Sequence, residues 1–427
     1  MVGIKSLGWL PEPYRRRNGA AAKKESSNLG ILAFEAAKTM SRLVSLYKSL
    51  SDEEICRLKN DVIKSEGISY LNSADEEFLL SLASAERLED LDRAANVVSR
   101  LGKKCDDFGL NRFDIFYMDM KLGIIDLGKL EYGTRVAAKK VREMEKLVET
   151  TSCLHAALAG LTELEILETK MKLLKNKNFD IFVQKIEHQR NEVRNFREIS
   201  LWSKSFDKIV DLMARIICVI YARICSVFGP QKKFSPKLTR PHSGPILTKS
   251  KPVLIRFYSR KTFDDEENVA KKDEVFHAAG PGTVGGSGLA LRYANVILSA
   301  EKYLESTAAI SYDERESLYQ MLPENLKGVV RMKLGKNMKM VEDDESLAEG
   351  WRTAVEEMMR WLVPVARDTV KWQMERNFEK MKFDGEGWVL LLQTLHFADK
   401  EKTEAAIVEV LVGLSCVLRF EKRRLGA

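Results

Sequence analysis

Apolar residues recur three and four positions apart along most of the chain, and only ten prolines interrupt its 427 residues. This spacing places the apolar side chains on one face of an α-helix. In the first half of the chain it covers the segments 29–50, 51–67, 73–102, 134–175 and 179–224. A second helical region runs from residue 284 to the end. The pattern therefore predicts an all-α fold.

Several helix ends have recognisable signals. Three Ser–Glu pairs have the spacing of a capping box: Ser51 with Glu54, Ser73 with Glu76, and Ser311 with Glu314. Gly67 and Gly102 follow apolar stripes, and we expect them to end helices. Gly160 interrupts the longest stripe, which favours antiparallel packing inside one domain over an extended coiled coil. Four Trp residues are expected to anchor the closing helices: Trp351, Trp361, Trp372 and Trp388.

The most apolar stretch runs from Ile209 to Gly229, and it contains Asp211, Arg215 and Arg223. A membrane-spanning helix needs about 20 apolar residues, and a central Arg costs about 2.5–3.5 kcal/mol even on the lenient insertion scale. We therefore expect a buried core helix rather than a membrane span.

The net charge of +7 is mild, but its distribution divides the chain. Residues 230–262 contain nine Lys or Arg, five Pro and no acidic residue, which is typical of a linker. The predicted organisation is therefore a basic N-terminal tail (1–28), a helical domain (29–229), a basic linker with Gly and Pro (230–283) and a second helical domain (284–427). Both domains are expected to be antiparallel bundles.

Two basic clusters are candidate targeting signals or contacts with an anionic partner. Their members are Arg15, Arg16, Arg17, Lys23 and Lys24 in the tail, and Lys232, Lys233, Arg256, Arg260 and Lys261 in the linker. The tail cluster suits a solvated segment, nuclear import or an anionic membrane. The linker cluster suits a solvated hinge, an anionic membrane or an acidic protein. Contact with nucleic acid, with Phe257 or Tyr258 stacking on bases, is a weaker alternative.

Gly280, Gly282 and Gly285 spell G-x-G-x-x-G, the pattern of a dinucleotide-binding loop. In that fold the loop follows a buried strand, yet the preceding residues 264–279 are rich in acidic and basic residues and unlike a core strand. We therefore expect a structural helix start. Gly285 and Gly286 would allow close packing, and Ser287 would cap a helix whose buried face includes Tyr293, Val296 and Leu304.

Other chemistry is sparse, and we expect no cofactor, metal or small-molecule substrate. The six Cys and five His show no zinc-binding spacing, and Cys218 and Cys225 are expected to pack inside a helix. His396, Asp399 and Glu404 gather at a predicted helix break. Acid–base chemistry is conceivable there, but helix capping by Asp399 or Thr403 fits better.

Four segments resemble a plant-specific family, the PSK (phytosulfokine) simulator proteins and their relatives. Residues 31–91 resemble the first of two paired domains, and residues 285–298 with 314–334 resemble the second. Residues 391–418 also match. The resemblance implies roles in plant growth and hormone-linked signalling at the nucleus or plasma membrane. It implies no catalytic residues.

The expected function is therefore a non-enzymatic growth-signalling adaptor that presents helix surfaces to protein partners. A peripheral membrane or trafficking factor that binds anionic lipid through the basic segments is the alternative. Several relatives begin with a myristoylation signal, whereas Val2 is expected to preclude N-myristoylation here. The expected location is the nucleus or cytoplasm, with the plasma-membrane periphery as a further site. No signal peptide or transmembrane helix is expected.

Overall fold

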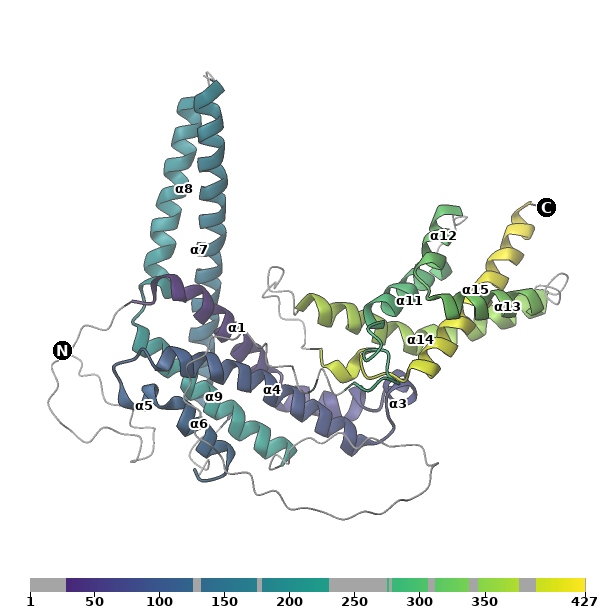
Figure 1. Cartoon of the computed structure of the whole chain (residues 1–427), viewed down its shortest axis with the longest axis horizontal. Coiled ribbons are helices and arrows are strands. Elements are labelled where there is room, and N and C mark those ends of the chain that lie inside the picture. The colour runs from purple at the N-terminus through teal and green to yellow at the C-terminus, as the bar shows by residue number, and fades with distance from the viewer. Residues whose placement is uncertain are drawn as a thin grey trace, which may run out of the picture.

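The computed structural model describes residues 28–125, 132–174, 179–229, 275, 279–305, 312–337, 345–375 and 389–426. Over these residues the molecule is built from α-helices and short helical turns, as predicted (Figure 1). Strand-like pairing among them is limited to two isolated bridges, Asn28 with Ser205 and Thr283 with Asp399.

Nine α-helices, a π-helical turn and the 3-10 turns Gly30–Leu32 and Leu201–Ser203 form the first half of the described chain. They are α1 (Ala33–Lys48), α2 (Asp52–Arg57), the π-turn Leu58–Val62, α3 (Glu66–Leu71), α4 (Glu76–Gly102), α5 (Phe108–Asn111), α6 (Phe113–Lys121), α7 (Arg135–Leu174), α8 (Phe179–Ile199) and α9 (Phe206–Phe228). The second half contains α11 (Ala290–Glu305), α12 (Tyr312–Gln320), α13 (Glu324–Asn337), α14 (Glu345–Glu375), the 3-10 turn Leu391–Gln393 and α15 (Lys400–Gly426).

The core of the first half forms around α9, which packs against α1 and α4. Two charged residues of this apolar helix form an ion pair or a hydrogen bond at its borders. Arg215 pairs with Asp211 at 2.9 Å, and Arg223 donates to the Leu50 carbonyl at 3.0 Å. The expected buried core helix is thus confirmed. None of the described helices combines the length and apolar character needed to cross a membrane.

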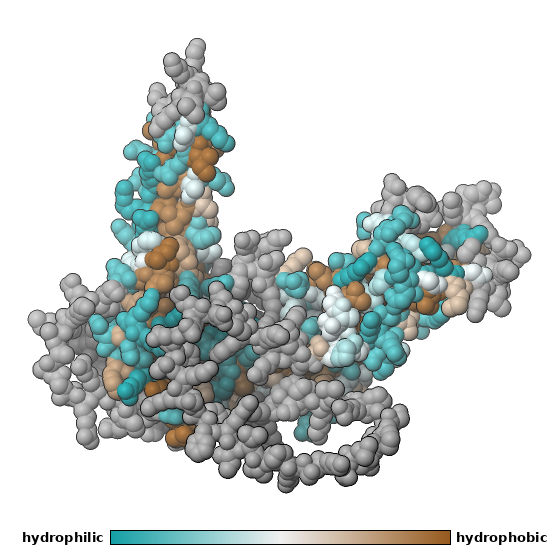
Figure 2. Space-filling view, in the orientation of Figure 1, coloured by the Kyte–Doolittle hydropathy of each residue, from teal (hydrophilic) through white to brown (hydrophobic). Residues whose placement is uncertain are grey.

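Helices α7 and α8 form an antiparallel hairpin that projects from the rest of the molecule (Figure 1). The predicted interruption at Gly160 is wrong, because α7 continues through this residue. The start of α7 packs on α1, whereas the outer part contacts mainly α8. Figure 2 shows hydrophobic residues along this arm, where Ile166 and Leu167 are 52% and 46% exposed.

In the second half, α11, α14 and α15 pack around a separate apolar core. Tyr293 and Val296 are fully buried on one face of α11, as predicted, while Leu304 is only half-buried. Trp372 is buried and Trp351 and Trp361 are half-buried against these helices. Trp388 lies outside the described residues.

The structure confirms one of the predicted helix caps and corrects another. Ser51 does cap α2, since its hydroxyl accepts from the Glu54 N–H at 3.2 Å. Ser73 does not cap α4. Asp75 takes that place and accepts from Glu77 and Phe78 at 3.0 and 3.1 Å.

One of the two glycines expected to end a helix has a different position. Gly102 is the last residue of α4, as expected, whereas Gly67 lies inside α3. Ser311, the third predicted cap, lies outside the described residues.

Candidate functional site: the junction of the two helical halves

The two halves meet where α3 lies against α14 (Figure 1). Gly67 allows this approach: a Cβ there would lie 2.6 Å from the Trp361 carbonyl oxygen and 2.9 Å from Val365 Cγ2. The ring of Tyr70 packs on that of Trp361, with centroids 5.3 Å apart. Gly67 therefore acts as a contact point between helices and not as a helix terminator.

A buried carboxylate joins the halves more deeply. Glu86 of α4 is only 3% exposed, and its two oxygens accept from the Trp372 indole N–H at 3.3 Å and the Leu391 backbone N–H at 2.8 Å. Trp372 ends the buried part of α14, and Leu391 begins the turn before α15. One side chain of the first half thus satisfies two donors of the second.

Three more hydrogen bonds link α3 and its C-terminal end to the segment before α15 and to the first turn of α15. Asn72 donates to the Leu392 carbonyl at 3.2 Å, and Asp399 donates its backbone N–H to the Leu71 carbonyl at 2.6 Å. Lys402 donates to the Tyr70 carbonyl at 3.0 Å. Together with an apolar cluster that contains side chains of α4 and the turn Leu391–Gln393, these bonds make the junction a packed interface.

The glycine motif lies in the second half and binds the segment 396–400, which itself contacts α3 through Asp399. The loop pairs with the backbone before α15: Val284 donates to the Ala398 carbonyl at 2.9 Å, and Gly285 donates to the His396 carbonyl at 3.0 Å. Lys400 donates back to the Gly282 carbonyl at 2.9 Å. The loop therefore runs alongside the segment 396–400 and pairs with its backbone as a short strand would.

The N–H groups of residues 283–289 all donate to acceptors inside the protein. A phosphate-binding loop must instead point its N–H groups at the ligand. The structure also shows close approach at both candidate glycines: a Cβ on Gly285 would lie 2.2 Å from His396 Nδ1, and one on Gly286 would lie 2.0 Å from the Gly280 carbonyl oxygen. These contacts give the motif a structural role.

The prediction that Ser287 caps a helix is wrong. Helix α11 begins at Ala290, and its first hydrogen bond runs from the Tyr293 N–H to the Leu289 carbonyl at 2.9 Å. Ser287 instead donates its hydroxyl to the Val284 carbonyl at 2.8 Å, which closes the loop. The helix starts later because the residues after Gly285 fold into turns that keep the loop against His396.

His396 is buried between aromatic rings. Its ring stacks on Trp372 with centroids 6.4 Å apart and meets Phe397 edge-on at 5.0 Å. Asp399 caps α15, since its carboxylate accepts from the Lys402 N–H at 2.9 Å, as predicted. His396 therefore serves as packing between the glycine loop and α14. Within the described residues, no group of His, Cys, Asp and Glu side chains is placed to hold a metal ion.

Arg87 is a second buried charge beside Glu86. Its guanidinium donates to the Ala83 carbonyl at 3.2 Å and the Ser49 carbonyl at 3.4 Å, just beyond the end of α1. Burial lowers the pKa of Arg87 to about 10, while Glu86 opposes this shift. A cation at the carbonyl end of a helix is electrostatically favourable. Arg87 thus links the end of α1 to α4, at the residue next to Glu86.

Asp368 of α14 is a titratable group whose pKa is shifted at the junction. Burial raises its pKa to about 6, opposed by Lys371, by Arg57 and by the hydrogen bond from Gln393. That bond, from the Gln393 amide to the carboxylate, measures 3.3 Å. An Asp with this pKa changes charge near the pH of the cell interior.

We expect Asp368→Asn to stabilise the protein at neutral pH, by about 2 kcal/mol after allowance for partial exposure. Because the folded-state pKa lies above the unfolded one, the contribution of Asp368 is fully present below about pH 4 and is lost as pH rises through 6. Urea unfolding of both proteins from about pH 4 to about pH 8 checks this. A difference between them that does not change with pH would contradict it.

The structure does not test the predicted basic contacts. Arg15, Arg16, Arg17, Lys23, Lys24, Lys232, Lys233, Arg256, Arg260 and Lys261 all lie outside the described residues. Glu86 and Arg87 were not among the residues predicted from the sequence. A signal was present, because Glu86 continues the apolar stripe of Leu79 and Leu82 in α4. A charge in such a stripe indicates a buried polar contact.

Comparison with known proteins shows that the junction joins two recognised domains. Residues 31–87 match a domain of unknown function (DUF3475), and residues 283–371 match a protein domain of unknown function (DUF668). Glu86 and Gly67 belong to the first, and Gly285, Trp361 and Asp368 to the second.

Curated relatives extend the match over nearly the whole chain. Protein PSK SIMULATOR 1 of Arabidopsis thaliana is 25% identical over 92% of this chain, and PSK SIMULATOR 3 of the same plant is 27% identical over 93%. The chain is thus similar to the PSK SIMULATOR proteins over nearly its whole length, and it contains both domains of unknown function. It spans 56% to 60% of the length of these relatives. No solved structure matches the chain.

Proposed function

We propose that the protein is a non-enzymatic signalling adaptor that promotes plant growth and is linked to phytosulfokine. The observation that carries the proposal is the similarity to three PSK SIMULATOR proteins of Arabidopsis thaliana over about 92% of the chain. The adaptor role is supported by the buried charges of the junction, because they serve to hold the two domains together and leave outer helix surfaces for partners.

The α7–α8 arm is the surface best suited to a protein partner. It projects from the molecule, and Ile166, Leu167 and Val183 are exposed along it. A projecting helical hairpin offers apolar side chains to another helix without rearrangement of the core. In this proposal the junction fixes the direction of the arm relative to the second domain.

Affinity purification from plant seedlings, followed by mass spectrometry, tests the adaptor function. The intact chain is compared with a variant in which Ile166, Leu167 and Val183 are replaced by Ser. We expect specific proteins to be recovered with the intact chain and depleted with the variant, and seedling growth to rise only when the intact chain is overproduced. Identical recovery and identical growth with both proteins would contradict the proposal.

A peripheral membrane function is the second candidate, favoured by the nine cations and absent acidic residues of the segment 230–262. Near an anionic leaflet each such cation contributes about 1 kcal/mol at most. Flotation with vesicles that contain or lack phosphatidylserine distinguishes the two functions. Salt-sensitive flotation that is lost when these cations are replaced would favour the membrane role.

A further inference from the structure

Helix α6 has apolar side chains on two opposite faces. Four of them are buried in the core of the first half: Phe113, Phe116, Tyr117 and Met120. On the outer side, Ile115, Met118 and Leu122, directly after the helix, are 48%, 56% and 69% exposed. Their spacing of three and four residues places them on one stripe of the surface, here named the outer face of α6. A helix that is apolar all round is typical of a buried position, so this face is expected to be covered by a partner.

The outer face of α6 is remote from the arm that is proposed for protein partners. Figure 1 shows α6 at the edge of the first half, on the side opposite to the α7–α8 hairpin. Contiguous apolar surface on a soluble protein marks an interaction site. A molecule bound to this face would therefore leave the arm accessible.

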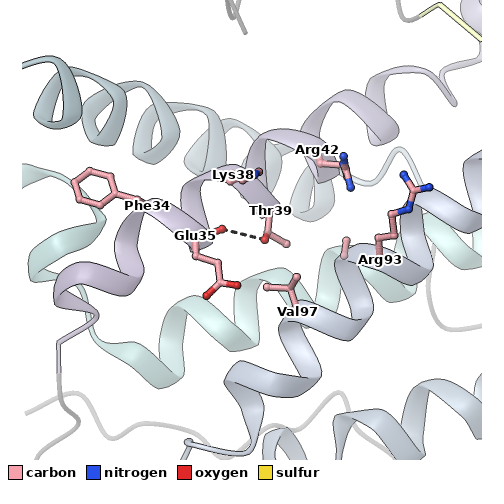
Figure 3. A pocket seen from close by; sticks show the side chains of 8 residues that line it. Phe34, Glu35, Lys38, Thr39, Arg42, Arg93 and Val97 are labelled. Carbon is pink, nitrogen blue, oxygen red and sulfur yellow. Dashed lines mark hydrogen bonds between the residues drawn. The ribbon is translucent and has the colours of Figure 1, made fainter. Parts of the chain in front are cut away.

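A groove of about 510 Å³ between α1 and α4 differs from this face in its chemistry (Figure 3). Its walls carry Lys38, Arg42 and Arg93, and each of these cations already interacts with other groups of the chain. Glu35 of the same walls pairs with Arg100. The charges of the groove thus serve the fold, whereas the outer face of α6 turns apolar side chains toward solvent.

Charged side chains border the outer face of α6 in an order that matches a second copy of it. At 3.6 residues per turn, Asp114 and Lys121 fall on one flank of the face, with the acid at the start of α6 and the base at its end. Arg112 and Asp119 fall on the other flank, with the signs reversed. Each flank therefore has charges of opposite sign at its two ends.

Both groups of the first flank can serve a second partner. Lys121 donates to the two oxygens of Asp92 at 2.9 and 2.7 Å, and its ammonium has three N–H donors. Asp114 accepts the Ile115 N–H at 2.9 Å through one oxygen, and a carboxylate has about four acceptor positions. These bonds within the chain hold the two side chains at the border of the face.

We propose that two copies of this chain associate through the outer face of α6, with the two helices antiparallel about a two-fold axis. Asp114 then meets the partner's Lys121. Ile115 meets the partner's Leu122, and Met118 lies near the axis. Antiparallel helices also place opposite ends of their dipoles together. This association is independent of the proposed adaptor function.

The expected affinity is modest, because the face is small. A standard interface buries about 800 Å² per partner, whereas α6 has only nine residues. We therefore expect a dissociation constant on the order of micromolar. Sedimentation velocity of the full chain over a concentration series should show a reversible equilibrium between monomer and dimer.

Matched variants decide whether α6 is responsible. Ile115→Ser with Leu122→Ser should weaken the dimer by about tenfold or more, because each copy loses two apolar contacts. The control is Ile166→Ser with Leu167→Ser, which removes two similarly exposed side chains from the arm. It should change the dissociation constant by less than about twofold.

Reversal of one charge tests the match along the flank. Asp114→Lys places a cation opposite the partner's Lys121 at both ends of the interface, so the dimer should weaken by about fivefold or more. Sodium chloride should strengthen association of this variant, because it screens the repulsion, and should slightly weaken that of the parent. Glu163→Lys on the arm is the control and should behave as the parent.

Oxidative cross-linking locates the two-fold axis. The background is the chain with its exposed thiols replaced, Cys56→Ser with Cys153→Ser. In this background Met118→Cys should form a disulfide-linked dimer rapidly, whereas Ile166→Cys on the arm should not. Circular dichroism of each variant confirms that the helices are retained.

Three results would overturn the proposal. The first is a protein that stays monomeric at every concentration, since another protein or another segment of the chain then covers the face. The second is equal weakening of the dimer by the α6 and arm variants. The third is cross-linking through Met118→Cys that is no faster than through Ile166→Cys.

Discussion

Glu86→Ala is expected to lower the free energy of unfolding by about 3–5 kcal/mol. The change leaves the buried Trp372 indole N–H and Leu391 backbone N–H without the carboxylate that accepts from them. It also removes the negative charge that helps to keep buried Arg87 protonated. Both losses occur inside the protein, where water cannot replace the missing partner.

Urea unfolding followed by circular dichroism measures this effect. Glu86→Gln keeps one acceptor oxygen and should cost less than Glu86→Ala. Glu163→Ala removes an exposed carboxylate from α7 and should change the free energy of unfolding by no more than about 0.5 kcal/mol. A loss below about 1 kcal/mol for Glu86→Ala would show that the junction does not depend on this side chain.

Gly285→Ala should destabilise the protein by about 2–3 kcal/mol, because the added methyl group meets a well-packed wall. The new Cβ would lie 2.2 Å from His396 Nδ1 and 2.4 Å from the His396 carbonyl oxygen. The backbone oxygen cannot move aside without breaking the bond that it accepts from the Gly285 N–H. The loop must therefore shift away from α15 and from Trp372.

Gly282→Ala is the control within the same motif, since its Cβ would have no neighbour within 4 Å. Its unfolding free energy should stay within about 0.5 kcal/mol of the parent value. Thermal and urea unfolding of both variants compare the two positions. Equal destabilisation, or saturable nucleotide binding that Gly282→Ala abolishes, would contradict the structural role of the motif.

The sequence predicted the helical content well because apolar spacing reports burial directly. Tyr293 and Val296 of α11 and the apolar face of α9 are buried as their spacing requires. The positions of the helix ends were predicted less accurately. Ser73 and Asp75 are both good capping residues two positions apart, and only the path of the chain decides between them.

The junction could not be predicted because its contacts join residues hundreds of positions apart. Gly67 has the local character of a helix terminator, and its role as a contact point depends on the Trp361 carbonyl oxygen. Likewise, nothing local to Glu86 identifies Leu391 as its partner. A single sequence states which side chains prefer burial, but pairing across such distances is decided by how the helices pack.

The chain contacts α4 both just before and just after the segment 230–274, and this affects where the protein tolerates insertions. Phe228, the last residue of α9, lies against Arg87 with its ring centroid 5.6 Å away, and Val275 donates its N–H to Glu89 at 2.9 Å. Both ends of the segment 230–274 are thus anchored two residues apart on one helix. The entropic cost of bringing two points of a chain together grows slowly with the length of chain between them, by about 0.6 kcal/mol for each doubling. This position can therefore accept a longer segment, or a whole inserted domain, while the two halves stay joined through α4.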